Sequence, residues 1–190
     1  MTISRFKSKY IYPVLFIIVL IILPQGASAQ DNQISFESRF ATIHIRGNVD
    51  LKLVDKNLNT RRVKSIHFRD YARIESGSLI ERISAKFDLL VLRTQEILDM
   101  YPDDFHVNIV IYERDDSLAE RYQEIKGEKI DLYSFYYYNN NTIYTSQRRL
   151  NANVMAHEIG HAVTNNYFVV LPPAKIRELL SQYVDVHLND

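Results

Sequence analysis

The sequence predicts an α+β domain with a small mixed sheet, and three observations carry this prediction. Residues 34–54 alternate between polar and apolar side chains, and residues 133–145 form two further strand-like runs around a turn. Residues 76–101 instead repeat apolar side chains at helical spacing. Residues 154–161 read V-M-A-H-E-I-G-H, and another helical segment, 174–188, follows them. The 190 residues are enough for one such domain.

Composition excludes several kinds of partner and site. The 23 basic and 23 acidic residues balance to a formal net charge of zero, so nothing indicates nucleic acid as the partner. The sequence contains no cysteine, which excludes disulfides and thiolate metal ligands. A zinc site in this chain therefore has to use nitrogen and oxygen ligands.

The N-terminus has the three parts of a secretory signal peptide. A basic start is followed by the unbroken apolar run Val14 to Leu23 and by the small-residue triplet Ala27-Ser28-Ala29. The apolar run is too short for a typical transmembrane helix. We therefore expect residues 1–29 to be removed and a domain of residues 30–190 to be exported to the periplasm or the cell exterior, with no membrane span. The alternative is an uncleaved anchor formed by residues 14–23.

The alternating segment 34–54 predicts a β-hairpin. Side chains alternate from Phe36 to His44, Gly47-Asn48 punctuates the pattern, and Val49 to Val54 alternates again. We place His44 on the surface of the first strand, because no metal-type partner lies near it in the sequence. The polar and basic stretch that follows, 57–73, is expected to be a solvated loop.

The middle of the chain predicts a helix, a strand and a second helix. The helix over 76–101 can be capped by Ser76 or Ser78, and Pro102 is expected to stop it. Residues 106–112 read H-V-N-I-V-I-Y, which is typical of a strand with a buried face. Residues 115–126 predict a short helix that ends at Gly127.

A second hairpin is expected directly before the H-E-x-x-H segment. The aromatic run 133–138 and the run 142–145 predict two strands, and three asparagines between them predict the turn. We expect Thr142–Thr145 to form a sheet edge that holds an extended peptide by main-chain hydrogen bonds. The alternative is a sheet edge without a ligand.

The H-E-x-x-H segment predicts a zinc site. On a helix, His157 and His161 lie one turn apart on the same face, so both imidazoles can bind one metal ion. Glu158 lies beside that face, where a carboxylate can take a proton from a water molecule that zinc activates. The alternative is a chance match on an ordinary core helix.

The third ligand is expected on the helix over 174–188. Glu178 and Asp185 are seven residues apart and share one face of that helix, whereas His187 lies on the opposite side from Glu178. We assign Glu178 as the third zinc ligand. Asp185 is then expected to accept a hydrogen bond from a ligating histidine. The alternative is that Glu178 and Asp185 are ordinary surface charges.

The spacing of these residues resembles the gluzincin metallopeptidases. His157-Glu158-x-x-His161 is followed after sixteen residues by Glu178. In the aminopeptidase-like branch and its small relatives, the glutamate helix reads much like E-G-F-A-x-Y-x-E. Four positions here line up with it: Glu178, Ser181, Tyr183 and Asp185. The resemblance covers residues of about 140 to 188.

This resemblance implies a zincin-like fold in which the H-E-x-x-H helix and the glutamate helix meet at the metal. It implies Zn²⁺ bound by His157, His161 and Glu178, with Glu158 as general base, and a peptide or protein as substrate. The metzincin pattern is not matched, since Thr164 and Tyr167 stand where it needs glycine and histidine. The G-A-M-E-N anchor of the aminopeptidases is also absent from the sequence.

Two functions remain open from the sequence. The first is an exported zinc peptidase, in which Tyr144 or Tyr183 donates a hydrogen bond to the oxyanion. The second is a zincin-fold binding module of the cell envelope with little or no turnover. Larger gluzincins carry a tyrosine or histidine donor in a further C-terminal subdomain, and the printed sequence ends shortly after Glu178, which favours the second function. Retention of Glu158 favours the first, because a purely structural zinc site does not need that carboxylate.

Overall fold

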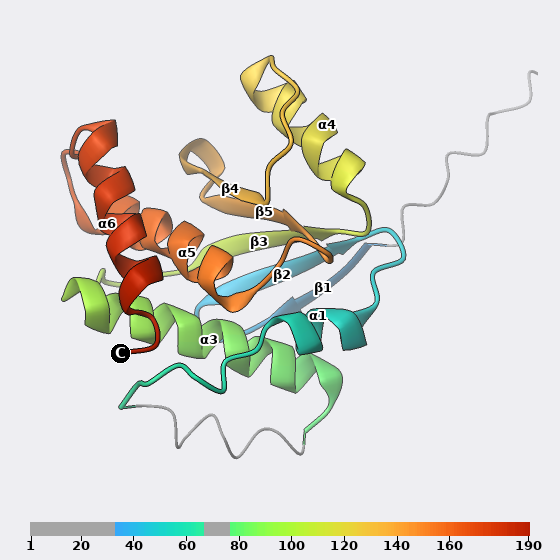
Figure 1. Ribbon diagram of the computed structural model, residues 1–190, viewed down its shortest axis with the longest axis horizontal. Helices are drawn as coiled ribbons and strands as arrows, with labels where there is room; N and C mark the ends of the chain where they lie inside the picture. Colours follow the sequence, from blue (N-terminus) through green and yellow to red (C-terminus); the bar gives the residue numbers. More distant parts are fainter. Residues whose placement is uncertain (1–32, 67–76) are drawn as a thin grey trace, which may run out of the picture. The chain divides into compact units, whose positions relative to one another are not determined.

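A mixed sheet organises the computed structural model, which describes residues 33–66 and 77–190 (Figure 1). The strand order is β1-β2-β3-β5-β4. The three inner strands run parallel to one another, and each outer strand is antiparallel to its neighbour. The predicted α+β class with a mixed sheet is therefore confirmed. The strand bounds are β1 Gln33–Glu37, β2 Ala41–Arg46, β3 Val107–Tyr112, β4 Ser134–Tyr137 and β5 Thr142–Ser146.

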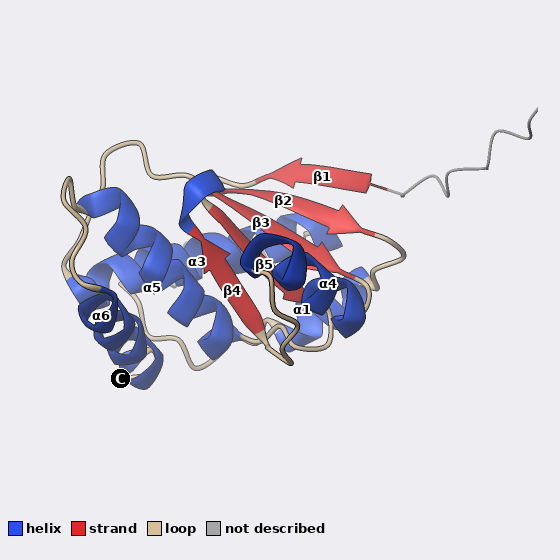
Figure 2. Ribbon diagram, turned by 90° about the horizontal axis from the view of Figure 1, so that it is seen from above, coloured by secondary structure: helices blue, strands red, loops and turns tan. Residues whose placement is uncertain are grey.

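Helices cover both faces of this sheet (Figures 1 and 2). Four of them share the main hydrophobic core with the strands: α1 Leu51–Asn57, α3 Leu79–Leu98, α5 Ala152–Tyr167 and α6 Ala174–His187. Helix α4 (Asp115–Lys126) covers the other face, where a smaller cluster forms around Leu118, Phe135 and Tyr144. A short 3-10 turn, η2 (Tyr138–Asn140), links β4 to β5.

The long helix begins with the predicted kind of cap. The Ser78 hydroxyl accepts a hydrogen bond from the N–H of Glu81, and the Glu81 carboxylate accepts one from the N–H of Ser78. Ser78 is therefore the cap, and the prediction that Ser76 could serve falls outside the described residues. The helix ends at Leu98 because Asp99 adopts the left-handed conformation (φ 50°), before Pro102 is reached.

The strand predicted over Val49–Val54 is wrong, because this segment begins helix α1. The Asp50 carboxylate accepts hydrogen bonds from the backbone N–H groups of Lys52 (2.9 Å) and Leu53 (3.3 Å), so it satisfies two free donors of the first turn. The first hairpin is instead formed by β1 and β2. His44 lies on β2 and bonds Ser35 across this hairpin, in agreement with its predicted surface position.

The second hairpin is confirmed, but its edge is the opposite strand. β5 pairs with β3 on one side and with β4 on the other, so Thr142–Thr145 lies inside the sheet. The edge strand of this hairpin is β4, and β1 forms the other edge of the sheet. Of the two strands of the hairpin, an extended peptide can therefore add only to β4. Two further predictions are confirmed. The strand predicted over residues 106–112 is β3, and the helix predicted over residues 115–126 is α4, which ends at Gly127 with φ 82°.

Among the helices described in residues 33–66 and 77–190, none combines the length and the apolar character that a membrane span requires. The expected signal peptide, residues 1–29, lies outside the described residues.

Candidate metal centre

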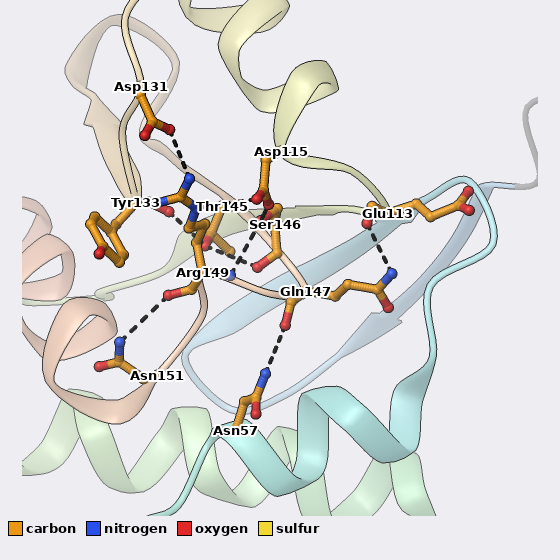
Figure 3. A network of polar contacts seen from close by, with 10 residues as sticks. All are labelled: Asn57, Glu113, Asp115, Asp131, Tyr133, Thr145, Ser146, Gln147, Arg149 and Asn151. Atoms are coloured by element: carbon orange, nitrogen blue, oxygen red, sulfur yellow. Dashed lines mark hydrogen bonds and ion pairs between the residues drawn. The ribbon is translucent and has the colours of Figure 1, made fainter.

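The start of helix α5 is fixed by polar contacts of the segment between β5 and α5 (Figure 3). The Arg149 guanidinium binds the carboxylates of Asp115 (3.2 Å) and Asp131 (2.8 Å). The backbone carbonyl of Gln147 accepts a hydrogen bond from the Asn57 side chain (2.8 Å). Asn151 then caps the helix, because its side-chain oxygen accepts from the N–H of Val154 (3.0 Å). The position of the H-E-x-x-H turn therefore depends on contacts with α1, with α4 and with the connection that follows α4.

Helix α5 carries both histidines on the face that meets α6. The rings of His157 and His161 are 5.0 Å apart and nearly perpendicular. Between them in the sequence lies Gly160, which packs against α6 at Ser181. A Cβ at Gly160 would lie 3.1 Å from the Ser181 Oγ and 3.2 Å from the Ser181 Cα. Glycine at this position therefore lets α6 pack closely enough for a carboxylate on it to reach the histidines.

That carboxylate is Glu178. Its Oε1 lies 3.7 Å from His157 Nε2, and its Oε2 lies 3.4 Å from His161 Nε2. One ligand atom from each of the three residues can be chosen so that all lie within 4.8 Å of one another. Tetrahedral zinc with bonds of about 2.1 Å separates its ligand atoms by about 3.4 Å, so these positions fit a zinc ion. Gln182 holds the carboxylate from one turn further along α6 by donating to Oε1 (3.0 Å).

The electrostatics of the pair suit a metal ligand. Burial and, to a smaller extent, the neighbouring His157 lower the pKa of His161 to about 4, although Glu178 acts in the opposite direction. His161 is therefore a neutral imidazole at physiological pH. Only the neutral ring offers a lone pair to a metal ion.

Glu158 contacts the edge strand β4 through its carboxylate. It is 7% exposed, and its carboxylate accepts a hydrogen bond of 2.7 Å from the Ser134 hydroxyl on β4. Burial raises the pKa of Glu158, while Ser134, the charge of His157 and the N–H of Tyr136 act in the opposite direction. The carboxylate is thus held between the histidine helix and the strand where a peptide can bind.

Ser134 was not singled out by the sequence, in which it is one residue of an aromatic run. The only signal available was its position at the start of the strand before the H-E-x-x-H helix. It also lines a cavity of about 420 Å³ that opens beside His157 and Glu158. The other walls of this cavity come from the connection before β4, from the first turn of α5 and from α6: Tyr133, Asn151, Asn153, Val154 and Asp185.

The expected role of Asp185 is wrong. Its carboxylate accepts a hydrogen bond from the Asn153 side chain (2.9 Å), and within the described residues neither His157 nor His161 bonds to it. The Asn153 amide also donates to the Asp185 carbonyl (3.1 Å), so the pair ties the end of α6 to the start of α5. Asp185 therefore helps to align the two helices rather than orienting a ring.

Neither tyrosine that was considered as an oxyanion donor faces the metal centre. Tyr144 is buried in the cluster under α4, on the opposite face of the sheet from α5, and its hydroxyl accepts from Asn140 (2.9 Å). The ring of Tyr183 contacts that of His187 in a tilted arrangement, with ring centroids 4.0 Å apart. At about 100° per residue it projects from α6 roughly 140° away from Glu178. The donor proposed from the sequence is therefore not supplied by either residue.

No protein-family model, no curated protein and no solved structure matches the chain. An assignment of function therefore depends on the chemistry of His157, Glu158, His161 and Glu178.

Proposed function

We propose that this chain is a zinc-dependent peptidase of the gluzincin type, with a zincin-like arrangement of its sheet and helices. The observation that carries the proposal is the convergence of His157, His161 and Glu178 within 4.8 Å, with a buried carboxylate at Glu158 next to them. An antiparallel edge strand beside the H-E-x-x-H helix, and a glutamate on the following helix, support the zincin-like reading. The chain would hold one zinc ion through these three ligands.

In the proposed hydrolysis of a peptide bond, Glu158 transfers the proton and Ser134 positions Glu158. Bound zinc supplies a Lewis acid that polarises the peptide carbonyl and lowers the pKa of a water molecule to about 7. Glu158 accepts a proton from the attacking water as the new C–O bond forms at the carbonyl carbon. Glu158 then gives this proton to the amide nitrogen as the C–N bond breaks. The Ser134 hydroxyl fixes the position of the carboxylate for both transfers.

The substrate is expected to bind along β4. This strand pairs with β5 on one side, and its other side carries no strand within the described residues. An extended peptide can therefore add to the sheet by main-chain hydrogen bonds. Ser134 lies on this strand and bonds Glu158, so a peptide that lies along β4 passes beside the general base.

We also propose that the protein acts outside the cytoplasm. The basic, apolar and small-residue parts of residues 1–29 support export through a cleavable signal peptide. The membrane-anchored form, held by residues 14–23, is the alternative.

A zinc-binding module without turnover is the second candidate. The observation in its favour is that Tyr144 and Tyr183 both project away from the metal centre, which leaves no assigned side-chain donor for the oxyanion. The position of Glu158 argues against it. Burying a carboxylate costs free energy, and a structural zinc site gains nothing from that carboxylate.

The Glu158→Gln variant distinguishes the two candidates. The amide keeps the size of the side chain and can still accept from Ser134, and the three ligands are untouched, so zinc should remain bound. The variant cannot accept a proton, and general-base catalysis contributes about 10²- to 10⁴-fold. In a peptide-library assay with both proteins loaded with zinc, the variant should therefore cleave at least about 10²-fold more slowly than the wild type. A wild type that holds zinc and cleaves no peptide, together with a variant that supports the same biological phenotype, would leave the binding module.

A further inference from the structure

Helix α6 has a second apolar face, and this face is largely open to solvent in the described structure. Its inner face buries Ser181 and Val184 against α5. The outer face carries four large apolar side chains with much of their surface open to solvent: Ile176 (44% exposed), Leu179 (51%), Tyr183 (49%) and Val186 (71%). We call these four residues the outer stripe. A contiguous apolar surface of this kind on a helix is typical of a contact site.

The spacing of the outer stripe is symmetric. The steps between its residues are three, four and three, so the stripe has the same pattern when read in either direction about position 181. If two copies of α6 pack antiparallel about a twofold axis at that position, Ile176 of one copy faces Val186 of the other. Leu179 likewise faces Tyr183. A surface that is complementary to itself is the requirement for a twofold dimer.

The charges of α6 favour the antiparallel direction. Lys175 lies at the start of the helix, whereas Asp190 lies just beyond its end. An antiparallel pair brings the basic end of each helix to the acidic end of the other. A parallel pair would bring like charges together.

We propose that this protein forms a twofold homodimer through the outer stripes of two antiparallel α6 helices. The contact does not use the metal ligands, because Glu178 projects from α6 toward α5. Partly exposed side chains of this size each leave on the order of 100 Å² open, so the eight side chains of two stripes cover on the order of 800 Å². This area is below that of a standard interface, so the dissociation constant is expected to be micromolar, about 1 to 100 µM.

Disulfide trapping tests the direction of the pair, because the natural chain has no cysteine. The variants Ile176→Cys and Val186→Cys are prepared separately from an exporting host, mixed in equal amounts and oxidised. In the antiparallel dimer, identical positions at either end of the stripe lie about 15 Å apart along the axis, too far for a disulfide. The mixture should therefore form cross-linked dimers, and each variant alone should stay monomeric under denaturing electrophoresis. Cross-linking of each variant with itself would overturn the proposal in favour of a parallel pair.

Sedimentation analysis over a concentration range tests association itself. The wild type should shift from monomer toward dimer between about 1 and 300 µM, in line with a micromolar dissociation constant. Val186→Lys and Tyr183→Lys should raise this constant at least tenfold, whereas Asn189→Lys, which adds the same charge outside the stripe, should leave it near the wild-type value. Far-UV circular dichroism and zinc content verify that each variant is folded. A wild type that stays monomeric at 300 µM overturns the proposal. The proposal is also overturned if the monomer sediments with lipid vesicles and the Val186→Lys and Tyr183→Lys variants do not, because the stripe would then bind membranes.

Discussion

Replacing Gly160 by alanine should loosen the metal centre without touching a ligand. The added Cβ would lie 3.2 Å from the Cα of Ser181, whereas carbon atoms in ordinary contact are about 3.5 to 4.0 Å apart. Helix α6 therefore has to move by about 0.3 to 0.8 Å. The Glu178 oxygens that now lie 3.4 and 3.7 Å from the two histidines move with it. Zinc ligands tolerate errors of about 0.2 Å in distance, so zinc affinity should fall about 10- to 100-fold.

The effect on folding should be smaller and separable. Alanine is favoured over glycine within a helix by about 1 kcal/mol, and overpacking costs about 1 to 3 kcal/mol, so the metal-free variant should lose at most about 2 kcal/mol of stability. Zinc affinity is measured by competition with a chelator of known affinity, and stability by urea unfolding of the metal-free protein.

Gly127→Ala is the matched control for this experiment. A Cβ at Gly127 meets nothing within 4 Å, but its φ of 82° strains any other residue. This control should lose stability and keep wild-type zinc affinity. If Gly160→Ala also bound zinc as tightly as the wild type, the contact between α5 and α6 would not set the ligand spacing, and our reasoning would be refuted.

Three further predictions concern the ligands, the pH dependence and the N-terminus. Glu178→Ala should lose most zinc by elemental analysis, whereas Asp185→Ala should keep it. The reverse result would exchange their roles. Because the pKa of His161 is about 4 in the folded protein and about 6.5 in an unfolded chain, the unfolded state binds more protons below pH 6.5. The metal-free protein should therefore lose about 3 kcal/mol of stability between pH 6.5 and 4 in urea titrations, and a His161→Gln variant should lack this loss. Mass spectrometry of the exported protein should find Gln30 at its start, and an uncut chain in the membrane fraction would favour the anchor.

The elements that could be predicted from the sequence are those whose signal is local and long. Helix α3 repeats apolar side chains over five turns and carries a capping box, so the sequence predicted its bounds to within three residues at each end. Helix α1 has only seven residues, and over so short a segment an alternating pattern also fits one face of a helix. The two hydrogen bonds that the Asp50 carboxylate accepts cap the first turn and favour the helix there.

The errors at the site have a common physical cause, because they depend on contacts between distant segments. The pattern of residues 133–145 predicts a hairpin but not which of its strands pairs with β3. That pairing makes β4 the edge. It also turns Tyr144 toward α4, away from the metal centre. By contrast, His157 and His161 share a face of α5, as helical spacing predicts, and the structure brings Glu178 of α6 close to both of them.

The hydrogen bond between Ser134 and Glu158 is where the sheet and the H-E-x-x-H helix meet chemically. A zinc site that only stabilised the fold would need α5 and α6 to pack together. Gly160 allows this packing, and His157, His161 and Glu178 would complete such a site. It would gain nothing from a fourth ionisable group that is 7% exposed and whose pKa burial raises. A hydrolase does gain from it, because the proton acceptor has to lie between the metal and the strand that holds the peptide. The free energy spent on burying Glu158 beside β4 is therefore the strongest argument for a peptidase over a binding module.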